Sequence, residues 1–122
     1  MAIEIDDATV GKQVQAYTHI APDDIGAEPV TLVPAKADHY GVLVEVGFYN
    51  SDSETRTVTI ADGATVFREL NIEAGGVIEV WLDDSRNLTW TGAENAAITA
   101  TASAADVVRV TGGRYYYRAV SQ

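Results

Sequence analysis

Apolar and polar residues alternate with a period of two along most of the chain from Tyr40 onward. This period is typical of a β-strand with one buried face, because successive side chains of a strand point to opposite sides. In the first such segment one face carries Val42, Val44, Val46 and Phe48, and the other carries Leu43, Glu45 and Tyr49. We therefore predict a strand here that buries the first set.

Turn-forming residues separate the alternating segments at short intervals, as in a chain of antiparallel strands. The predicted strands after the first one cover residues 57–60, 66–72, 77–82, 88–91, 96–103, 107–111 and 114–120. Gly112 and Gly113 lie between the last two and predict a tight hairpin connection.

Residues 1–38 differ from the rest because Pro22, Pro29 and Pro34 divide them into short pieces. Proline cannot donate a hydrogen bond to a sheet, so strands here suit a sheet edge. We predict an N-terminal arm or edge segment over 1–38, with strands at 13–20 and 30–33, and a β-sandwich core over 39–122. The chain forms a single domain overall.

Eight to ten short strands without a convincing helix predict an all-β fold, an antiparallel two-sheet sandwich that is jelly-roll-like. Two packed sheets bury one face of each strand. An immunoglobulin-like sandwich is the alternative.

The charge and the composition of the chain exclude several classes of binding partner and of chemistry. The chain of 122 residues has a formal net charge of −10 and no cysteine. This charge argues against binding to nucleic acid or to an anionic membrane surface, and the missing cysteines exclude disulfides and thiolate chemistry. With no secretion signal and no apolar run long enough to span a membrane, we expect synthesis in the cytoplasm.

The sequence contains no recognisable catalytic motif. His19 and His39 are the only histidines, and no Gly-x-Ser-x-Gly motif is present. Acidic pairs at 6–7, 23–24 and 83–84 fit turns better than a calcium site, which needs six to eight oxygen ligands. We predict that the chain is not an enzyme and has no cofactor, no metal ion and no catalytic residue.

Aromatic and arginine side chains form the candidate interface. In the last strand Tyr115 and Tyr117 share one face and Tyr116 shares the other with Arg114 and Arg118, so we expect one of these faces to lie in the core and the other to be partly exposed. Trp and Arg are frequent interface anchors. The candidate partner-binding residues are Trp81, Trp90, Tyr116, Arg114 and Arg118, with Trp81 preferred because it falls on the face of Glu79.

Several segments resemble small β-sandwich (jelly-roll-like) structural proteins of tailed bacteriophages. The resemblance lies in residues 41–46, 50–52, 56–63, 68–70, 74–76, 98–105 and 107–117. It implies a head decoration or other minor virion protein that clamps neighbouring capsid subunits, often as a trimer, and it implies no catalytic residue.

We therefore hypothesise a noncatalytic virion structural protein, a capsid decoration or cementing protein on the capsid surface. Its partners would be the major capsid protein and further copies of itself in a homotrimer, with no nucleic acid and no membrane. We expect loss of residues 1–38 to abolish attachment while the remaining sheet stays folded. The alternative is a carbohydrate- or receptor-binding β-sandwich module of a phage tail that uses Trp or Tyr platforms.

Overall fold

The computed structural model describes residues 17–63, 65–81 and 90–120, which form strands and turns. These residues include no helix that is long and apolar enough to cross a membrane. The ten strands are β1 (Thr18–Ile20), β2 (Asp23–Ile25), β3 (Val30–Val33), β4 (His39–Asn50), β5 (Arg56–Ala61), β6 (Val66–Ile72), β7 (Val77–Trp81), β8 (Trp90–Thr91), β9 (Ile98–Ala102) and β10 (Val108–Ala119). The all-β prediction and its strand number are confirmed.

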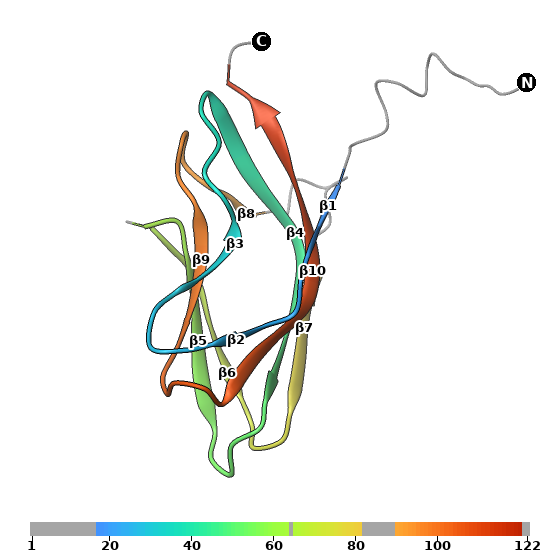
Figure 1. The fold of residues 1–122 in the computed structure, drawn as a ribbon, viewed down its shortest axis with the longest axis vertical. Coiled ribbons are helices and arrows are strands. Elements are labelled where there is room, and N and C mark those ends of the chain that lie inside the picture. Colours follow the sequence, from blue (N-terminus) through green and yellow to red (C-terminus); the bar gives the residue numbers. More distant parts are fainter. Residues whose placement is uncertain (1–16, 64, 82–89, 121–122) are drawn as a thin grey trace, which may run out of the picture.

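Two antiparallel sheets face each other (Figure 1). Sheet A has the order β1-β10-β4-β7, with β2 beside β1 on the same side of β10 and β8 beside β7 on the same side of β4. Sheet B has the order β3-β9-β5-β6. Each sheet is therefore four positions wide.

The chain crosses between the sheets at six of the nine connections between the described strands. It alternates from β2 through β3 and β4 to β5, and again from β8 through β9 to β10. Among the described strands, β5 and β6 are the one successive pair that hydrogen-bond to each other. This interleaved order is that of a jelly roll, whereas an immunoglobulin-like sandwich keeps successive strand pairs in one sheet. The predicted jelly-roll sandwich is confirmed, and the immunoglobulin-like alternative is wrong.

The described part of the N-terminal segment supplies edge strands to both sheets. β1 and β2 pair with β10, and β3 pairs with β9 over the residues that the sequence predicted. Four of its side chains are buried between the sheets: Ile20, Ile25, Leu32 and Val33. These strands are thus part of the folded sandwich.

β4 and β10 each contain a bulge that reverses which face a side chain takes. Val44 has no partner between the pairs Leu43–Tyr115 and Glu45–Arg114, and Thr111 has none between Val110–Phe48 and Gly112–Gly47. Leu43, Val46 and Phe48 consequently face the main core, while Val42 and Val44 lie with Tyr116 in a separate cluster. The predicted single face of Val42, Val44, Val46 and Phe48 is wrong because a bulge adds one residue to a two-residue period.

Gly112 and Gly113 do not form a hairpin. β10 runs through both of them as one strand of 12 residues. Gly112 has a φ of +145°, which suits the bulge, and a Cβ on Gly113 would collide with the carbonyl oxygen of Glu45. These glycines permit close approach of β4 and β10, so the predicted turn at this position is wrong.

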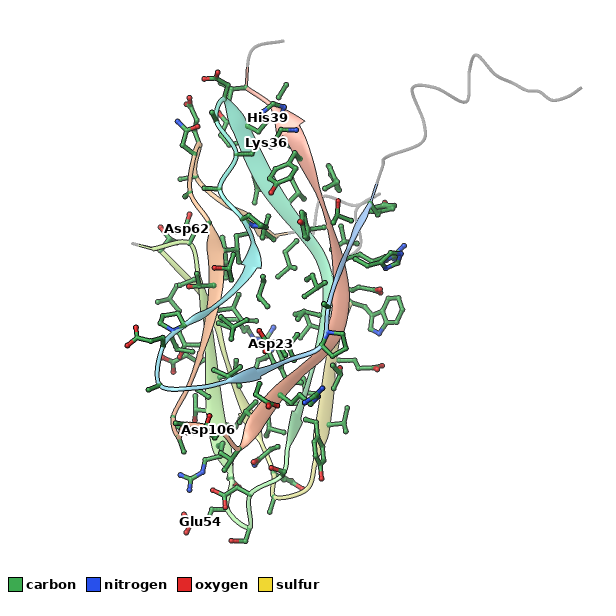
Figure 2. All side chains as sticks on the ribbon, in the orientation of Figure 1. Asp23, Lys36, His39, Glu54, Asp62 and Asp106 are labelled. Atoms are coloured by element: carbon green, nitrogen blue, oxygen red, sulfur yellow. The ribbon has the colours of Figure 1, made fainter. Side chains whose placement is uncertain are left out.

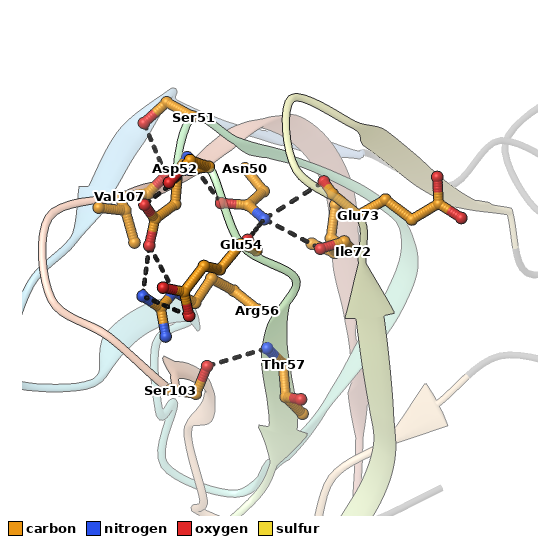
Figure 3. A network of polar contacts seen from close by, with 11 residues as sticks. Asn50, Ser51, Asp52, Glu54, Arg56, Thr57, Ile72, Glu73, Ser103 and Val107 are labelled. Atoms are coloured by element: carbon orange, nitrogen blue, oxygen red, sulfur yellow. Dashed lines mark hydrogen bonds and ion pairs between the residues drawn. The ribbon is translucent and has the colours of Figure 1, made fainter.

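A buried asparagine ties together the turns at one end of the sandwich (Figure 3). Asn50 Nδ2 donates to the carbonyl oxygens of Ile72, at 2.9 Å, and Glu54, at 2.8 Å. Its Oδ1 accepts from the backbone N–H of Asp52 at 2.9 Å. Because Asn50 is fully buried, these bonds replace those that its amide loses with water.

The neighbouring carboxyl of Asp52 is held by Arg56. Arg56 Nε donates to Asp52 Oδ2 at 2.6 Å, and the backbone N–H of Ser53 donates to Oδ1. The hydrogen bond from Arg56 has the largest effect and the one from the Ser53 backbone the second largest, and both lower the pKa of the Asp52 carboxyl below its usual range. Folding therefore favours the ionised form of this residue.

Replacing Gly113 by alanine should lower the free energy of unfolding by about 1–3 kcal/mol, because the added Cβ meets backbone on the neighbouring strand. Urea denaturation measures this change. Gly26→Ala is the matched control, since its Cβ would make an ordinary contact, 3.5 Å from Asp106 Oδ1, and should change the stability by less than about 0.5 kcal/mol. Equal losses in both variants would contradict the close-approach explanation.

Asp52 should contribute stability only when it is ionised. Because its folded-state pKa lies below the unfolded one, the contribution is complete above about pH 4 and is lost as the pH falls through the folded-state pKa. The difference in unfolding free energy between the wild type and Asp52→Asn should therefore shrink below about pH 4 in a urea titration series. In an Arg56→Gln background that decline should be much smaller, and an unchanged decline would show that Arg56 is not its cause.

Removing residues 1–38 should unfold the domain, contrary to the expectation that the remaining sheet stays folded. The deletion takes four side chains out of the core and exposes the edges of β9 and β10 to solvent. Circular dichroism with thermal melting measures the outcome. A cooperative transition in the truncated protein would restore the interpretation of a separable arm.

Candidate partner-binding surface

The outer face of sheet A presents the most exposed large apolar side chains of the described residues. In β7, Ile78 and Val80 pack against the core, so Val77, Glu79 and Trp81 point outward. Trp81 is 69 % exposed and Val77 is 58 % exposed. The alternation therefore placed Trp81 correctly on the solvent side, on the face of Glu79.

The register of β7 against β4 sets what surrounds Trp81. Trp81 lies opposite Glu45, Glu79 opposite Gly47, and Val77 opposite Tyr49, which is 37 % exposed. Directly opposed side chains in an antiparallel pair lie close enough to touch. Gly47 thus interrupts this row, and the space that a side chain would take at this position is used by Thr111 Oγ1 and Glu79 Cγ.

A groove of about 180 Å³ lies along this part of β4, β7 and β10. Its lining consists of Glu45, Val46, Gly47, Glu79, Val80, Trp81, Thr111, Gly112 and Gly113. A Cβ on Gly47 would collide with Thr111 Oγ1, and it would lie 3.5 Å from Glu79 Cγ. Gly47 therefore allows Thr111 of β10 and the Glu79 side chain to lie close to β4, and Glu79 and Trp81 line the groove from β7.

Charged groups beside the groove are unevenly paired. Arg114 Nε donates to Glu45 Oε2 at 2.9 Å, and the Arg114 guanidinium lies 4.7 Å from the centre of the Tyr17 ring. Glu45 Oε1 is buried without a hydrogen-bond partner. The carboxylate of Glu79 has no ion pair or hydrogen bond within the described part of the chain.

The predicted interface residues do not all meet here. Trp81 lines the groove, and Arg114 reaches its rim through Glu45. Arg118 lies further along β10, with its guanidinium 5.5 Å from the centre of the Tyr40 ring. The backbone of Trp90 pairs with Leu43 in β8, and its side chain lies outside the described residues.

Tyr116 is buried rather than partly exposed. It is 6 % exposed, clusters with Val42 and Val44, and makes an edge-to-face contact with Tyr17 at 5.7 Å between ring centres. The sequence correctly separated its face from that of Tyr115 and Tyr117, which belong to the main core. It did not indicate that this second face is also covered.

The histidines and carboxylates do not converge on a reactive centre in the described residues. His39 Nδ1 lies 2.8 Å from the carbonyl oxygen of Ala37, and His19 lies on β1 opposite Arg114. Figure 2 shows Asp23, Glu54, Asp62 and Asp106 spread around the sandwich. Within residues 17–63, 65–81 and 90–120 no cluster of three His, Cys, Asp or Glu residues could hold a metal ion.

Among the described groups, Tyr117 is the one whose pKa is shifted strongly. Burial, together with the neighbouring Tyr115, raises the pKa of Tyr117 to about 12. Its hydroxyl donates to the carbonyl oxygen of Pro34 at 2.6 Å. A neutral, bonded phenol joins β10 to the segment after β3 and is unsuited to act as a general base.

Comparisons with known proteins assign no family. No protein-family model matches the chain, and no curated protein matches it. One solved structure, the virus-like particle of the extra small virus of the giant freshwater prawn Macrobrachium rosenbergii, shows 16 % sequence identity and a TM-score of 0.43. The match covers 84 % of this chain and 78 % of that one. A likeness at this level does not assign a function.

Proposed function

We propose that this chain is a noncatalytic virion structural protein, a capsid decoration or cementing protein that binds the assembled phage head through the outer face of sheet A. The observation that carries the proposal is Trp81, 69 % exposed beside a groove on a rigid jelly roll. Its partner would be the major capsid protein.

Exposed apolar groups on this face suit protein binding. Trp81 and the opposed pair Val77 and Tyr49 belong to two adjacent strands. Tryptophan and tyrosine are enriched among residues that dominate binding energy, because a large ring buries much apolar surface with few rotatable bonds. β7 also pairs with β4 alone among the described strands, so its outer edge can accept a further strand.

The scaffold behind this face is suited to reinforcing a shell. Both sheets share one apolar core, and the N-terminal strands are part of it. A protein that binds the assembled capsid and not its separate subunits favours the assembled state by mass action. In this proposal several copies act together, as a homotrimer on the capsid surface, which raises the effective affinity of each contact.

A carbohydrate- or receptor-binding module of a phage tail is the second candidate. The exposed ring of Trp81 resembles a stacking platform, and the carboxylate of Glu79 is an acceptor for hydroxyl groups. Jelly rolls also occur in lectins. This candidate uses the same groove with a different ligand.

Trp81→Ala should weaken attachment to capsids while leaving the isolated protein about as stable as the wild type. The side chain is mostly exposed, so its removal should change the unfolding free energy by less than about 0.5 kcal/mol. As an interface anchor, it should cost roughly tenfold or more in affinity. Co-sedimentation with purified particles that lack the protein measures attachment, and thermal melting measures stability.

Val66→Ala on β6 is the matched control, because Val66 is 55 % exposed but belongs to sheet B. It should leave attachment unchanged. Undiminished attachment of Trp81→Ala would refute the proposed binding face. A glycan array that retains the wild type but not Trp81→Ala would favour the tail module.

A further inference from the structure

We infer that the Trp81 groove binds a single cationic side chain, the guanidinium of arginine or the ammonium of lysine, from an extended segment of the partner. This inference rests on the proposed function for the source of that segment. The residues that line the groove are the reason to expect a positively charged ligand.

The groove has room for one small group. Its volume is about 180 Å³, and a protein cavity of roughly 150 Å³ accommodates benzene. Gly47, Gly112 and Gly113 contribute only backbone to its lining. A planar guanidinium therefore fits, whereas a folded protein segment does not.

The two β7 side chains in the lining favour a positive charge. Glu79 and Trp81 are two residues apart on one strand and so share the outer face. The indole face attracts a cation through its quadrupole, and the carboxylate of Glu79 attracts it directly. Glu79 has no ion partner among the described residues, so its charge is free for a ligand.

Glu45 lines the groove from β4 without adding net charge to it. Its Oε2 is bonded to Arg114, which neutralises the pair, but Oε1 lacks a donor. This oxygen is enclosed, so a donor in the groove reaches it only if the carboxylate rotates toward the ligand. With Glu45 and Arg114 balanced, Glu79 leaves the groove one negative charge.

Charge complementarity selects among possible occupants. The chain carries a net charge of −10, and the described residues that line the groove include no basic one. An anionic ligand would be repelled by Glu79, and a copy of this chain that placed its acidic surface in the groove would be repelled as well, which leaves homotrimer contacts elsewhere unaffected. A basic segment of another protein is the occupant that this surface attracts.

Titration with a model peptide tests the inference. The probe is the acetylated and amidated peptide Gly-Gly-Arg-Gly-Gly, and its counterpart with glutamine in place of arginine is the neutral control. Nuclear magnetic resonance of the ¹⁵N-labelled full chain follows the Trp81 indole N–H. The arginine peptide should shift this signal in a saturable manner that weakens as salt is added, and the glutamine peptide should not.

Two variants locate the binding groups. Glu79→Gln and Trp81→Leu should each weaken arginine-peptide binding roughly three- to tenfold. For Trp81→Leu the backbone amide of Gly47 replaces the lost indole signal as the reporter. Glu69→Gln, an exposed carboxylate on β6 of sheet B, is the matched control and should leave the affinity unchanged.

Three results would overturn the inference: equal shifts with both peptides, equal effects of Glu79→Gln and Glu69→Gln, or saturable shifts with saccharides instead of the arginine peptide. Particle co-sedimentation separates this failure from that of the proposed function. Wild-type attachment without peptide binding would reject the cation site alone. Peptide binding without attachment would reject the capsid role and leave the groove chemistry standing.

Discussion

The pairing of β4 with β10 is the interaction on which the rest of the structure depends. Each strand has 12 residues, and together they form the centre of sheet A. One face of this pair supplies Phe48, Val110 and Tyr115 to the main core. The other face carries the floor of the groove, so the same ladder supports both folding and the candidate binding surface.

The two bulges explain how one pair of strands serves both purposes. A bulge leaves one residue unpaired and increases the local twist. Thr111 interrupts β10 and Val44 interrupts β4, and the residues between these interruptions include Gly47 and Gly113. Glycine is required where Gly113 approaches the Glu45 carbonyl and where Thr111 Oγ1 lies against Gly47. The groove lies along this close contact of the two central strands.

The residues that stabilise the fold differ from the residue that we propose as the main binding contact. Asn50 and the Asp52–Arg56 pair fasten the turns at one end, and the buried aliphatic residues join the sheets. Trp81 contributes little to either, because most of its surface remains in water. A large apolar side chain in that position is costly for solubility, which is one reason to connect it with a partner.

The sequence by itself determined most of the strands, their approximate limits and the class of fold, because a two-residue period is a local property of an extended chain with one buried face. Its prediction of a turn at Asp23 and Asp24 was wrong, because these residues pair with β10 as part of β2. Residues 30–33 and the outward direction of Trp81 followed from local pattern alone. Trp81 and Arg114 were also identified as candidates, but Glu45, Gly47 and Glu79 were not, although a glycine inside a strand is a signal of close approach.

Only the tertiary structure decided the bulges, the continuous course of β10 and the burial of Tyr116. Gly112 and Gly113 have the local chemistry of a hairpin turn, and the distant carbonyl of Glu45 gives them a different role. The groove likewise requires residues of three strands to meet across a register that no local pattern encodes. Alternation reports which way a side chain points, whereas packing between strands far apart in sequence determines what it meets there.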